Sequence, residues 1–182
     1  QNMYQMLSRM NIRSRNKGRW FFYQRILGQE KPILNKLAEF AAIKGKRILY
    51  LTNRSILKEQ IEESINAEIR NKLRSNRDIK SENQAKVMQV KLYQTIENEC
   101  KRNSDYRAID LEKYDFIIAD EWHYFSVGST FNTCTQLSYN WIMSKKYATL
   151  IFISAAIDRI KDYILRDNNI SEITEEERWR NG

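Results

Sequence analysis

The sequence predicts a doubly wound, mostly parallel α/β sheet flanked by helices. Three compact apolar runs, RILYLT (47–52), DFIIA (115–119) and TLIFIS (149–154), are apolar at successive positions, as strands buried on both faces of a parallel sheet are. Amphipathic stretches lie between them, and the whole chain contains only 5 Gly and 1 Pro, so few residues interrupt helices. Strands alternating with helices are typical of a parallel sheet covered on both sides.

The first elements follow from local signals. WFFYQRIL (20–27) contains β-forming residues without a clean alternation. Apolar residues then recur at helical spacing over 33–41, and Gly45 stands where a C′ glycine would end that helix. The run 47–52 follows directly as a strand.

The alternation continues to the C-terminal tail. Ser55 is a candidate N-cap for a long amphipathic helix whose apolar positions extend to Ile69. The later elements expected are a helix end and exposed loop (70–86), a strand (87–90), a helix from 92, a strand (115–119), a helix around 137–143, a strand (149–154) and a helix over 157–164. We therefore divide the chain into a basic, aromatic leader (1–26), one α/β domain (27–166) and a polar tail (167–182).

Composition restricts the class of protein. A chain of 182 residues is long enough for one domain with a real core. No apolar run approaches the roughly 20 residues needed to cross a bilayer, so no membrane partner is expected. Cys100 and Cys134 are isolated thiols, which favours a reducing, cytoplasmic location, and with His123 as the single histidine a Cys/His zinc site is disfavoured. The chain begins with Gln1 rather than Met, as a fragment of a longer protein would.

Charge is concentrated in the N-terminal third. The chain carries a net charge of +8, and residues 1–60 hold 13 Lys and Arg against 3 Asp and Glu, a local net of +10. This pattern fits an anionic partner such as nucleic acid, although a solvated cationic surface would look the same. Likewise, the aromatic run 20–23 in the leader would either stack on bases or pack in the core.

Polar residues follow the predicted strands at the edge where ligands bind in parallel sheets. These strand ends are TNR (52–54), KLYQT (91–95), DEWH (120–123) and SAA (154–156). Together they resemble the first RecA-like domain of superfamily-two DEAD/DEAH-box (DExH) helicases, over about residues 27–165. The resemblance implies a RecA-like, P-loop NTPase-type fold, ATP and Mg²⁺ as cofactors, nucleic acid as a partner, and a second RecA-like domain that this chain does not contain.

The segment 120–123 resembles the D-E-x-H form of the Walker B motif. By that resemblance Asp120 holds Mg²⁺ through water, Glu121 orients the water that attacks the γ-phosphate, and His123 links the nucleotide to the motif after the next strand. Phosphoryl transfer needs metal-held charge and a positioned water, which carboxylates supply. The alternative is an Asp-Glu pair that caps the next helix, beside a surface histidine.

The other strand ends match further motifs of these helicases. Ser154 corresponds to the first residue of a Ser-Ala-Thr motif and would contact Asp120 or His123, although Ala156 replaces the final Thr. A helix cap is the alternative for Ser154.

Two strand ends correspond to nucleic-acid motifs. Thr52, Asn53 and Arg54 match motif Ia, which contacts the nucleic-acid backbone. Tyr93 and Gln94 resemble the next such motif, with core packing as the alternative for Tyr93. Such contacts recognise the backbone rather than the base sequence.

The candidate phosphate loop departs from the family pattern. A working loop reads G-x-x-x-x-G-K-[ST], whereas this chain has LGQEKP (27–32). Gly28 and Lys31 remain as nucleotide-binding candidates. Glu30 replaces the glycine before the lysine, and Pro32 replaces the hydroxyl residue that binds Mg²⁺. An ordinary turn without nucleotide is the alternative.

Three hypotheses follow. The first is the ATP-binding core domain of a DExH helicase or translocase, as a degenerate copy or a fragment with weak or no activity alone. The alternative is a non-catalytic nucleic-acid-binding module on a RecA-like fold. The third is an unrelated α/β nucleotide-binding protein whose strand ends match by chance.

Overall fold

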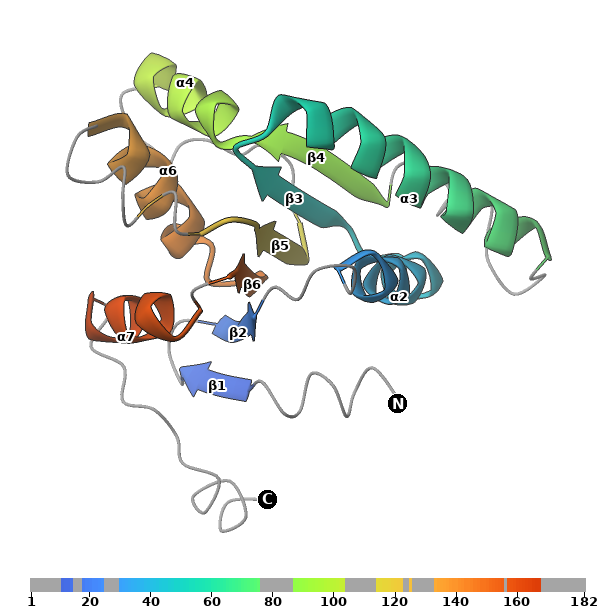
Figure 1. Ribbon diagram of the computed structural model, residues 1–182, viewed down its shortest axis with the longest axis horizontal. Helices are drawn as coiled ribbons and strands as arrows, with labels where there is room; N and C mark the ends of the chain where they lie inside the picture. The colour runs from blue at the N-terminus through green and yellow to red at the C-terminus, as the bar shows by residue number, and fades with distance from the viewer. Residues whose placement is uncertain are drawn as a thin grey trace, which may run out of the picture.

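A single six-stranded sheet organises the protein in the computed structural model (Figure 1). The structure describes residues 11–14, 18–24, 30–75, 87–103, 114–122, 125, 133–155 and 157–167. The strands are β1 (Asn11–Ser14), β2 (Gly18–Gln24), β3 (Ile48–Thr52), β4 (Met88–Leu92), β5 (Phe116–Ala119) and β6 (Thr149–Ser154). The helices are α2 (Glu30–Ile43), α3 (Ser55–Ser75), α4 (Tyr93–Asn103), α6 (Thr133–Ser144) and α7 (Ile157–Asp167).

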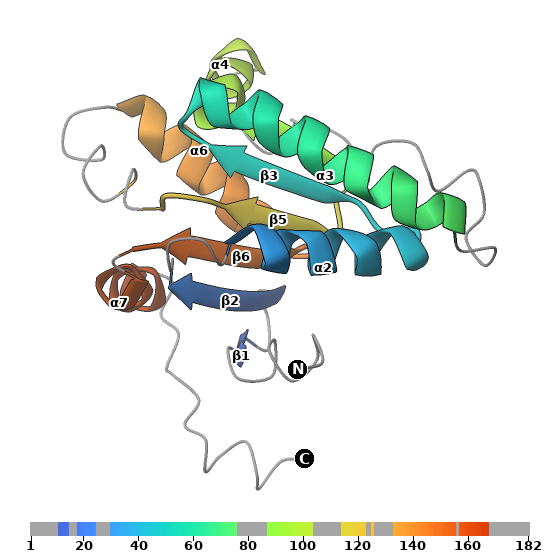
Figure 2. The ribbon, with the colours of Figure 1, turned by 45° about the vertical axis from the view of Figure 1, so that its right-hand side comes forward.

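The sheet is parallel except at one edge, in the order β1-β2-β6-β5-β3-β4. Every neighbouring pair from β2 to β4 is parallel, and β1 pairs with β2 in the antiparallel sense. Helices α2 and α3 cover one face, whereas α4, α6 and α7 pack on the other (Figure 2). The predicted doubly wound, mostly parallel α/β fold is therefore confirmed.

The apolar strands supply two cores because successive side chains point to opposite faces of the sheet. In β3, Ile48 and Tyr50 face α2 and α3, whereas Leu49 and Leu51 face α4 and α6. All five residues of this strand are buried. This burial on both faces explains why the interiors of the predicted strands are apolar at successive positions.

Helix α2 ends at the predicted glycine. Gly45 has a φ of 62°, a value at which a side chain with a Cβ atom is unfavourable. The Gly45 N–H donates to the Ala42 carbonyl at 3.3 Å, and the Lys46 N–H donates to the Ala41 carbonyl at 2.7 Å. These two bonds form a Schellman motif, which turns the chain directly into β3.

Part of the expected leader belongs to the sheet. Strand β2 lies between β1 and β6, and Trp20, Phe21 and Phe22 are buried. The rings of Trp20 and Phe22 pack against Phe152 of β6, with centroids 6.1 and 5.1 Å apart. Of the two alternatives for the aromatic run, core packing is therefore correct for these three side chains. They are too buried to stack on bases. The sheet begins upstream of residue 27.

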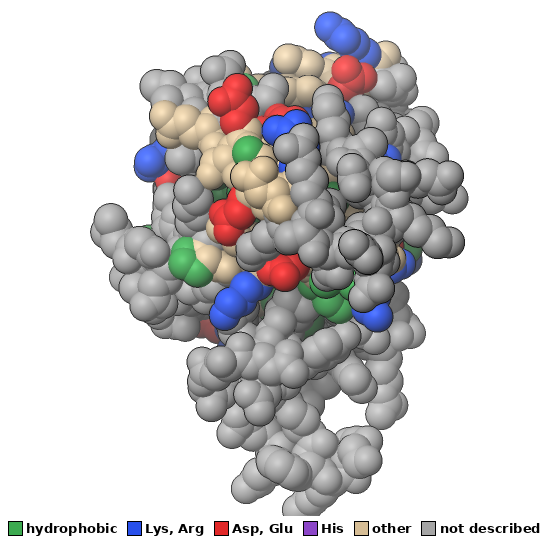
Figure 3. Space-filling model, turned by 90° about the vertical axis from the view of Figure 1, so that its right-hand side faces the viewer, with side chains coloured by type: hydrophobic (Ala, Val, Ile, Leu, Met, Phe, Trp, Pro, Cys, Tyr) green, Lys and Arg blue, Asp and Glu red, His purple; other side chains and the backbone are tan. Residues whose placement is uncertain are grey.

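The apolar character of the helices and the charges on one face of the molecule can both be described. None of its helices is both long and apolar enough to span a bilayer. Figure 3 shows the side of the molecule towards which the C-terminal end of α3 points, and acidic and basic side chains lie side by side among those coloured there. Segment 76–86 and the tail from 168 lie outside the described residues.

Candidate nucleotide and nucleic-acid site

The sheet order brings three of the predicted motifs to one edge. Strand β5 lies between β3 and β6, and Ala119 pairs with Leu51 on one side and Phe152 on the other. Because these strands are parallel, their carboxyl ends open at the same edge. Asp120 continues the ladder for one more bond, as its N–H donates to the Leu51 carbonyl at 2.9 Å.

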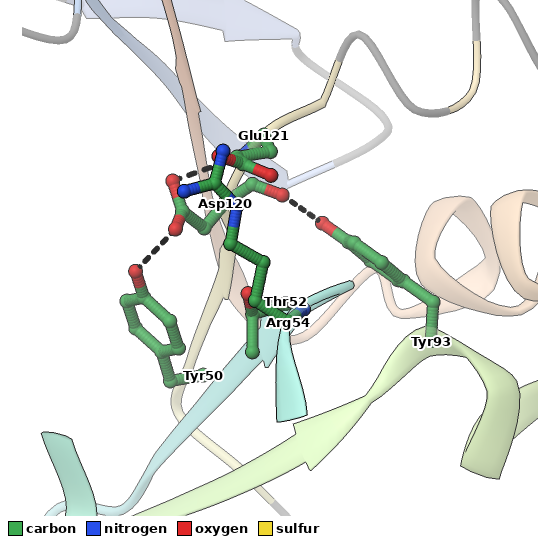
Figure 4. Close-up of polar contacts among 6 residues, drawn as sticks. All are labelled: Tyr50, Thr52, Arg54, Tyr93, Asp120 and Glu121. Atoms are coloured by element: carbon green, nitrogen blue, oxygen red, sulfur yellow. Dashed lines mark hydrogen bonds and ion pairs between the residues drawn. The ribbon is translucent and has the colours of Figure 1, made fainter. Parts of the chain in front are cut away.

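Asp120 is buried, and hydrogen bonds from its neighbours fix its carboxylate (Figure 4). The Tyr50 hydroxyl donates to Oδ2 at 2.6 Å, and the Glu121 N–H donates to Oδ1 at 2.8 Å. The Tyr93 hydroxyl donates to the Asp120 carbonyl at 2.7 Å. Residues from β3 and the start of α4 therefore hold both the side chain and the backbone of Asp120 in place.

Glu121 occupies an unusual backbone conformation. Its φ is 51°, in the left-handed region that costs a residue with a Cβ atom on the order of 1 kcal/mol or more. The next residue ties the turn to the neighbouring strand, since the Trp122 N–H donates to the Ile153 carbonyl at 3.2 Å. The turn directs the buried Glu121 side chain towards the end of β3.

Arg54 meets Glu121 at this edge. Its Nη2 lies 2.7 Å from Glu121 Oε1, and the side chains are 61% and 4% exposed respectively. The Arg54 N–H donates to Thr52 Oγ1 at 3.3 Å, which fixes the short turn between β3 and α3. The candidate motif Ia and the candidate Walker B motif are therefore in direct contact.

The predicted nucleic-acid residues divide into exposed and buried groups. Asn53, Arg54 and Gln94 are exposed. Thr52 and Tyr93 are buried, and the hydroxyl of each bonds within the site as described above. Of the five predicted residues, only these three have side chains open to an outside partner, while Thr52 and Tyr93 support the turns.

Of the remaining predicted residues, the structure describes Ser154 and Lys31 but not Gly28 and His123. Ser154 is buried at the end of β6, in register with Gln24 of β2. Lys31 lies in the first turn of α2, next to the exposed Pro32. Gly28 and His123 lie outside the described residues.

Tyr50 belongs to the site, although no sequence motif singles it out. A tyrosine inside an otherwise aliphatic strand is the available signal, because a buried hydroxyl needs a hydrogen-bond partner. That signal indicates that a partner exists without identifying it. The partner, Asp120, is 70 residues away along the chain.

The carboxylates at this edge suit Mg²⁺ in part. Mg²⁺ is usually held by one or two carboxylates together with waters and substrate phosphates, so Asp120 with Glu121 nearby is a suitable donor set. Pro32 offers no side-chain oxygen, so water would have to replace the usual hydroxyl ligand. Within the described ranges, no group of three or more His, Cys, Asp or Glu side chains forms an alternative metal site.

A second buried polar group lies between α4 and α6, away from the strand ends. Burial, together with the nearby Glu97 carboxylate, raises the pKa of Cys100 to about 11. The Ser138 hydroxyl donates to Glu97 Oε1 at 3.4 Å, and Lys145 Nζ lies 4.6 Å from the Trp141 ring centroid. A thiol with so high a pKa is protonated at neutral pH and is not an activated nucleophile.

The family model for the res subunit of type III restriction enzymes matches residues 33–159, more than two thirds of the chain. The chain belongs to this family. The res-subunit family is a P-loop, RecA-type domain of the DEAD/DEAH-box helicase-like kind, so the resemblance drawn from the strand ends is confirmed.

Family membership makes the chain a helicase-like ATP-binding domain in general terms. Proteins of the res-subunit family generally use ATP and Mg²⁺ and bind nucleic acid. The matched region contains TNR (52–54) and the Asp-Glu pair (120–121) but begins just after Lys31 and Pro32. No curated protein sequence matches the chain.

Proposed function

We propose that this chain is the ATP-binding core of a DExH-type helicase or translocase, in which ATP hydrolysis is coupled to movement on nucleic acid. The observation that carries the proposal is the contact between Arg54 and Glu121 at 2.7 Å. It joins a cationic, exposed turn suited to phosphate with the carboxylate pair suited to nucleotide hydrolysis. A second RecA-like domain is the expected partner that would complete the nucleotide site.

In this proposal the residues at the strand ends divide the work. Asp120 would hold Mg²⁺ through water, and the bound ion supplies charge neutralisation at the phosphates. Glu121 orients the attacking water, and the backbone turn at φ 51° sets the direction of its side chain. His123 couples this site to the motif at the end of β6, where Ser154 would contact Asp120 or His123. Gly28 and Lys31 are the candidate phosphate-loop contacts.

Nucleic acid would bind at the same edge. Asn53, Arg54 and Gln94 are exposed there, and amide and guanidinium groups are common phosphate donors. Such contacts give salt-dependent binding without a base preference. The free, buried thiol of Cys100 agrees with a cytoplasmic location, which is part of the proposal.

ATP binding tests the nucleotide part of the proposal. Asp120→Ala should abolish Mg²⁺-dependent ATP binding measured by calorimetry, whereas Asp162→Ala, at an exposed position of α7, should leave it unchanged. ATPase activity of the chain alone should be very low because the phosphate loop lacks its second glycine and hydroxyl. Turnover well above that of a Glu121→Gln control would contradict the expectation of low activity, and equal ATP affinity in Asp120→Ala would contradict the role of Asp120.

One observation favours the alternative function, a non-catalytic nucleic-acid-binding module. Pro32 lies in the first turn of α2, where it provides neither a backbone N–H nor a hydroxyl to a nucleotide. If the chain is such a module, single-stranded DNA should bind in a salt-sensitive manner that ATP does not change. In both functions Arg54→Ala should weaken that binding.

A further inference from the structure

The Arg54–Glu121 ion pair is asymmetric in its exposure. The arginine side chain is 61% exposed, whereas the glutamate side chain is 4% exposed. An arginine so open to solvent can be approached by another anion, and its planar group of N–H donors matches a phosphate well. Solvent at the exposed arginine screens its charge, so another anion can compete with Glu121 for the guanidinium.

The movable part of this pair is the arginine side chain. Glu121 is held by the turn at the end of β5, where the Trp122 N–H bonds to the Ile153 carbonyl. The Arg54 backbone is held through its N–H bond to Thr52 Oγ1 at the end of β3. Rotation of the Arg54 side chain can therefore break the ion pair without moving either strand.

We propose that Arg54 is a latch on Glu121 that nucleic acid releases. Without nucleic acid, the guanidinium engages the carboxylate oxygen that would otherwise orient the attacking water. A backbone phosphate of nucleic acid replaces Glu121 at the guanidinium, and the Glu121 carboxylate oxygen that Arg54 engaged can then orient the water. The inference rests on the proposed function and makes Arg54 a positioning residue that links the two sites.

The latch has a consequence that does not require hydrolysis. If Glu121 and phosphate compete for Arg54, then removing the charge of Glu121 must raise the affinity for nucleic acid, because linkage between two sites is reciprocal. This increase must depend on Arg54. A general loss of negative charge from the protein would raise the affinity for nucleic acid whether or not Arg54 is present.

The experiment is a double-mutant cycle on nucleic-acid affinity. Fluorescence anisotropy with labelled oligothymidylate, and with oligouridylate for RNA, is measured for wild type, Glu121→Gln, Arg54→Ala and the double variant. We expect Glu121→Gln to bind about two- to fivefold more tightly than wild type, the range of a partly exposed ion pair. Arg54→Ala should bind more weakly, and adding Glu121→Gln to it should change nothing.

Controls separate the latch from other effects. Glu99→Gln on α4 removes a carboxylate that lies 3.6 Å from Arg102, with the same change in net charge, and should leave affinity within twofold. Thermal unfolding checks that each variant folds. On the wild-type chain, carboxyl ¹³C spectra should show the Glu121 signal moving on oligonucleotide addition towards its position in Arg54→Ala.

The outcomes distinguish the two proposals. If neither oligonucleotide binds, the nucleic-acid part of the proposed function fails, and the latch fails with it. If Arg54→Ala weakens binding but Glu121→Gln has no effect in wild type, the latch is overturned and the proposed function stands. An equal gain from Glu121→Gln with and without Arg54 would also overturn the latch.

Discussion

At the scale of single residues, two buried tyrosine hydroxyls position Asp120. Tyr50 donates to its carboxylate and Tyr93 donates to its backbone carbonyl, at 2.6 and 2.7 Å. Tyr50 lies within β3 and Tyr93 begins α4, so each bond also ties a neighbouring element to the end of β5. The position of the candidate Mg²⁺ ligand therefore depends on side chains that touch no ligand in the proposed function.

Tyr50→Phe tests this support. The substitution keeps the ring but removes a donor to a buried carboxylate, so we expect the free energy of unfolding to fall by about 1–3 kcal/mol. Urea unfolding followed by circular dichroism measures the loss. Tyr163→Phe on α7 is the matched control, because Tyr163 is partly exposed and its change should stay within about 0.5 kcal/mol. If both variants lost the same free energy of unfolding, the hydrogen bond from Tyr50 to Asp120 would make no specific contribution to stability.

The sequence predicts which residues belong to the site better than it predicts which of them touch. Asp120, Glu121 and Arg54 were singled out by motif and by position after apolar strands. The bond of Tyr50 and the Arg54–Glu121 ion pair depend on β3 and β5 being neighbours with one particular register. A single sequence shows where strands end but does not show which strands lie next to one another.

At the scale of elements, Asp115 joins three strands at their amino ends, opposite the candidate site. Its carboxylate accepts from Lys46 Nζ at 2.8 Å and from the Arg47 N–H at 3.0 Å. Its own N–H donates to the Arg47 carbonyl, and its carbonyl accepts from the Thr149 N–H at 2.8 Å. The residue before β5 thus aligns β3 and β6 with it.

Asp115→Asn should show the pH dependence of this junction. Burial raises the pKa of the Asp115 carboxyl, but the Lys46 and Arg47 hydrogen bonds outweigh it, so the net pKa lies below its ordinary value of 3.8. A lowered pKa stabilises the folded state above 3.8, and this contribution is lost as pH falls through the folded-state pKa. We expect a loss of about 1 kcal/mol at pH 7, reduced because both charged side chains are partly exposed.

Urea unfolding of wild type and Asp115→Asn at pH 7 and near pH 2.5 measures this difference. The gap between the two proteins should narrow at the lower pH. Asp162→Asn removes an exposed carboxylate of α7 and serves as the control. A gap that stays constant or widens in acid would contradict the assignment to the ionised Asp115 carboxylate.

The elements themselves were predictable where periodicity was strong. The strand expected at 149–154 has those bounds in the structure, and the helix expected from Ser55 begins there. The strand expected at 87–90 is shifted to Met88–Leu92. Its last residues, Lys91 and Leu92, are only partly buried at the sheet edge, so their hydropathy did not mark the end of the strand.

At the scale of the whole molecule, the sheet includes a strand that local sequence could not assign. WFFYQ has aromatic residues that suit either a nucleic-acid surface or a core. Pairing with β6, which is about 130 residues away along the chain, places this segment in the core. With β2 in place, β6 becomes an internal strand, and the aromatic core behind the sheet gains Trp20 and Phe22.

Trp20→Ala tests whether β2 is integral to the domain. Trp20 is 1% exposed and packs edge-on against Phe152, so truncation should lower the free energy of unfolding by about 3–5 kcal/mol through lost burial and a residual cavity. Tyr147→Ala, which truncates an aromatic ring that is 60% exposed, should cost about 0.5 kcal/mol or less. Urea unfolding measures both losses, and Trp20→Phe gives a milder variant should Trp20→Ala not fold.

If Trp20→Ala cost no more than Tyr147→Ala, residues 18–24 would be a dispensable leader, and the domain would begin near residue 27. A large loss of stability would mean that the basic N-terminal segment helps to stabilise the same sheet that carries Asp120 and Glu121. Truncating this segment to study nucleic-acid binding would then also disturb the candidate site.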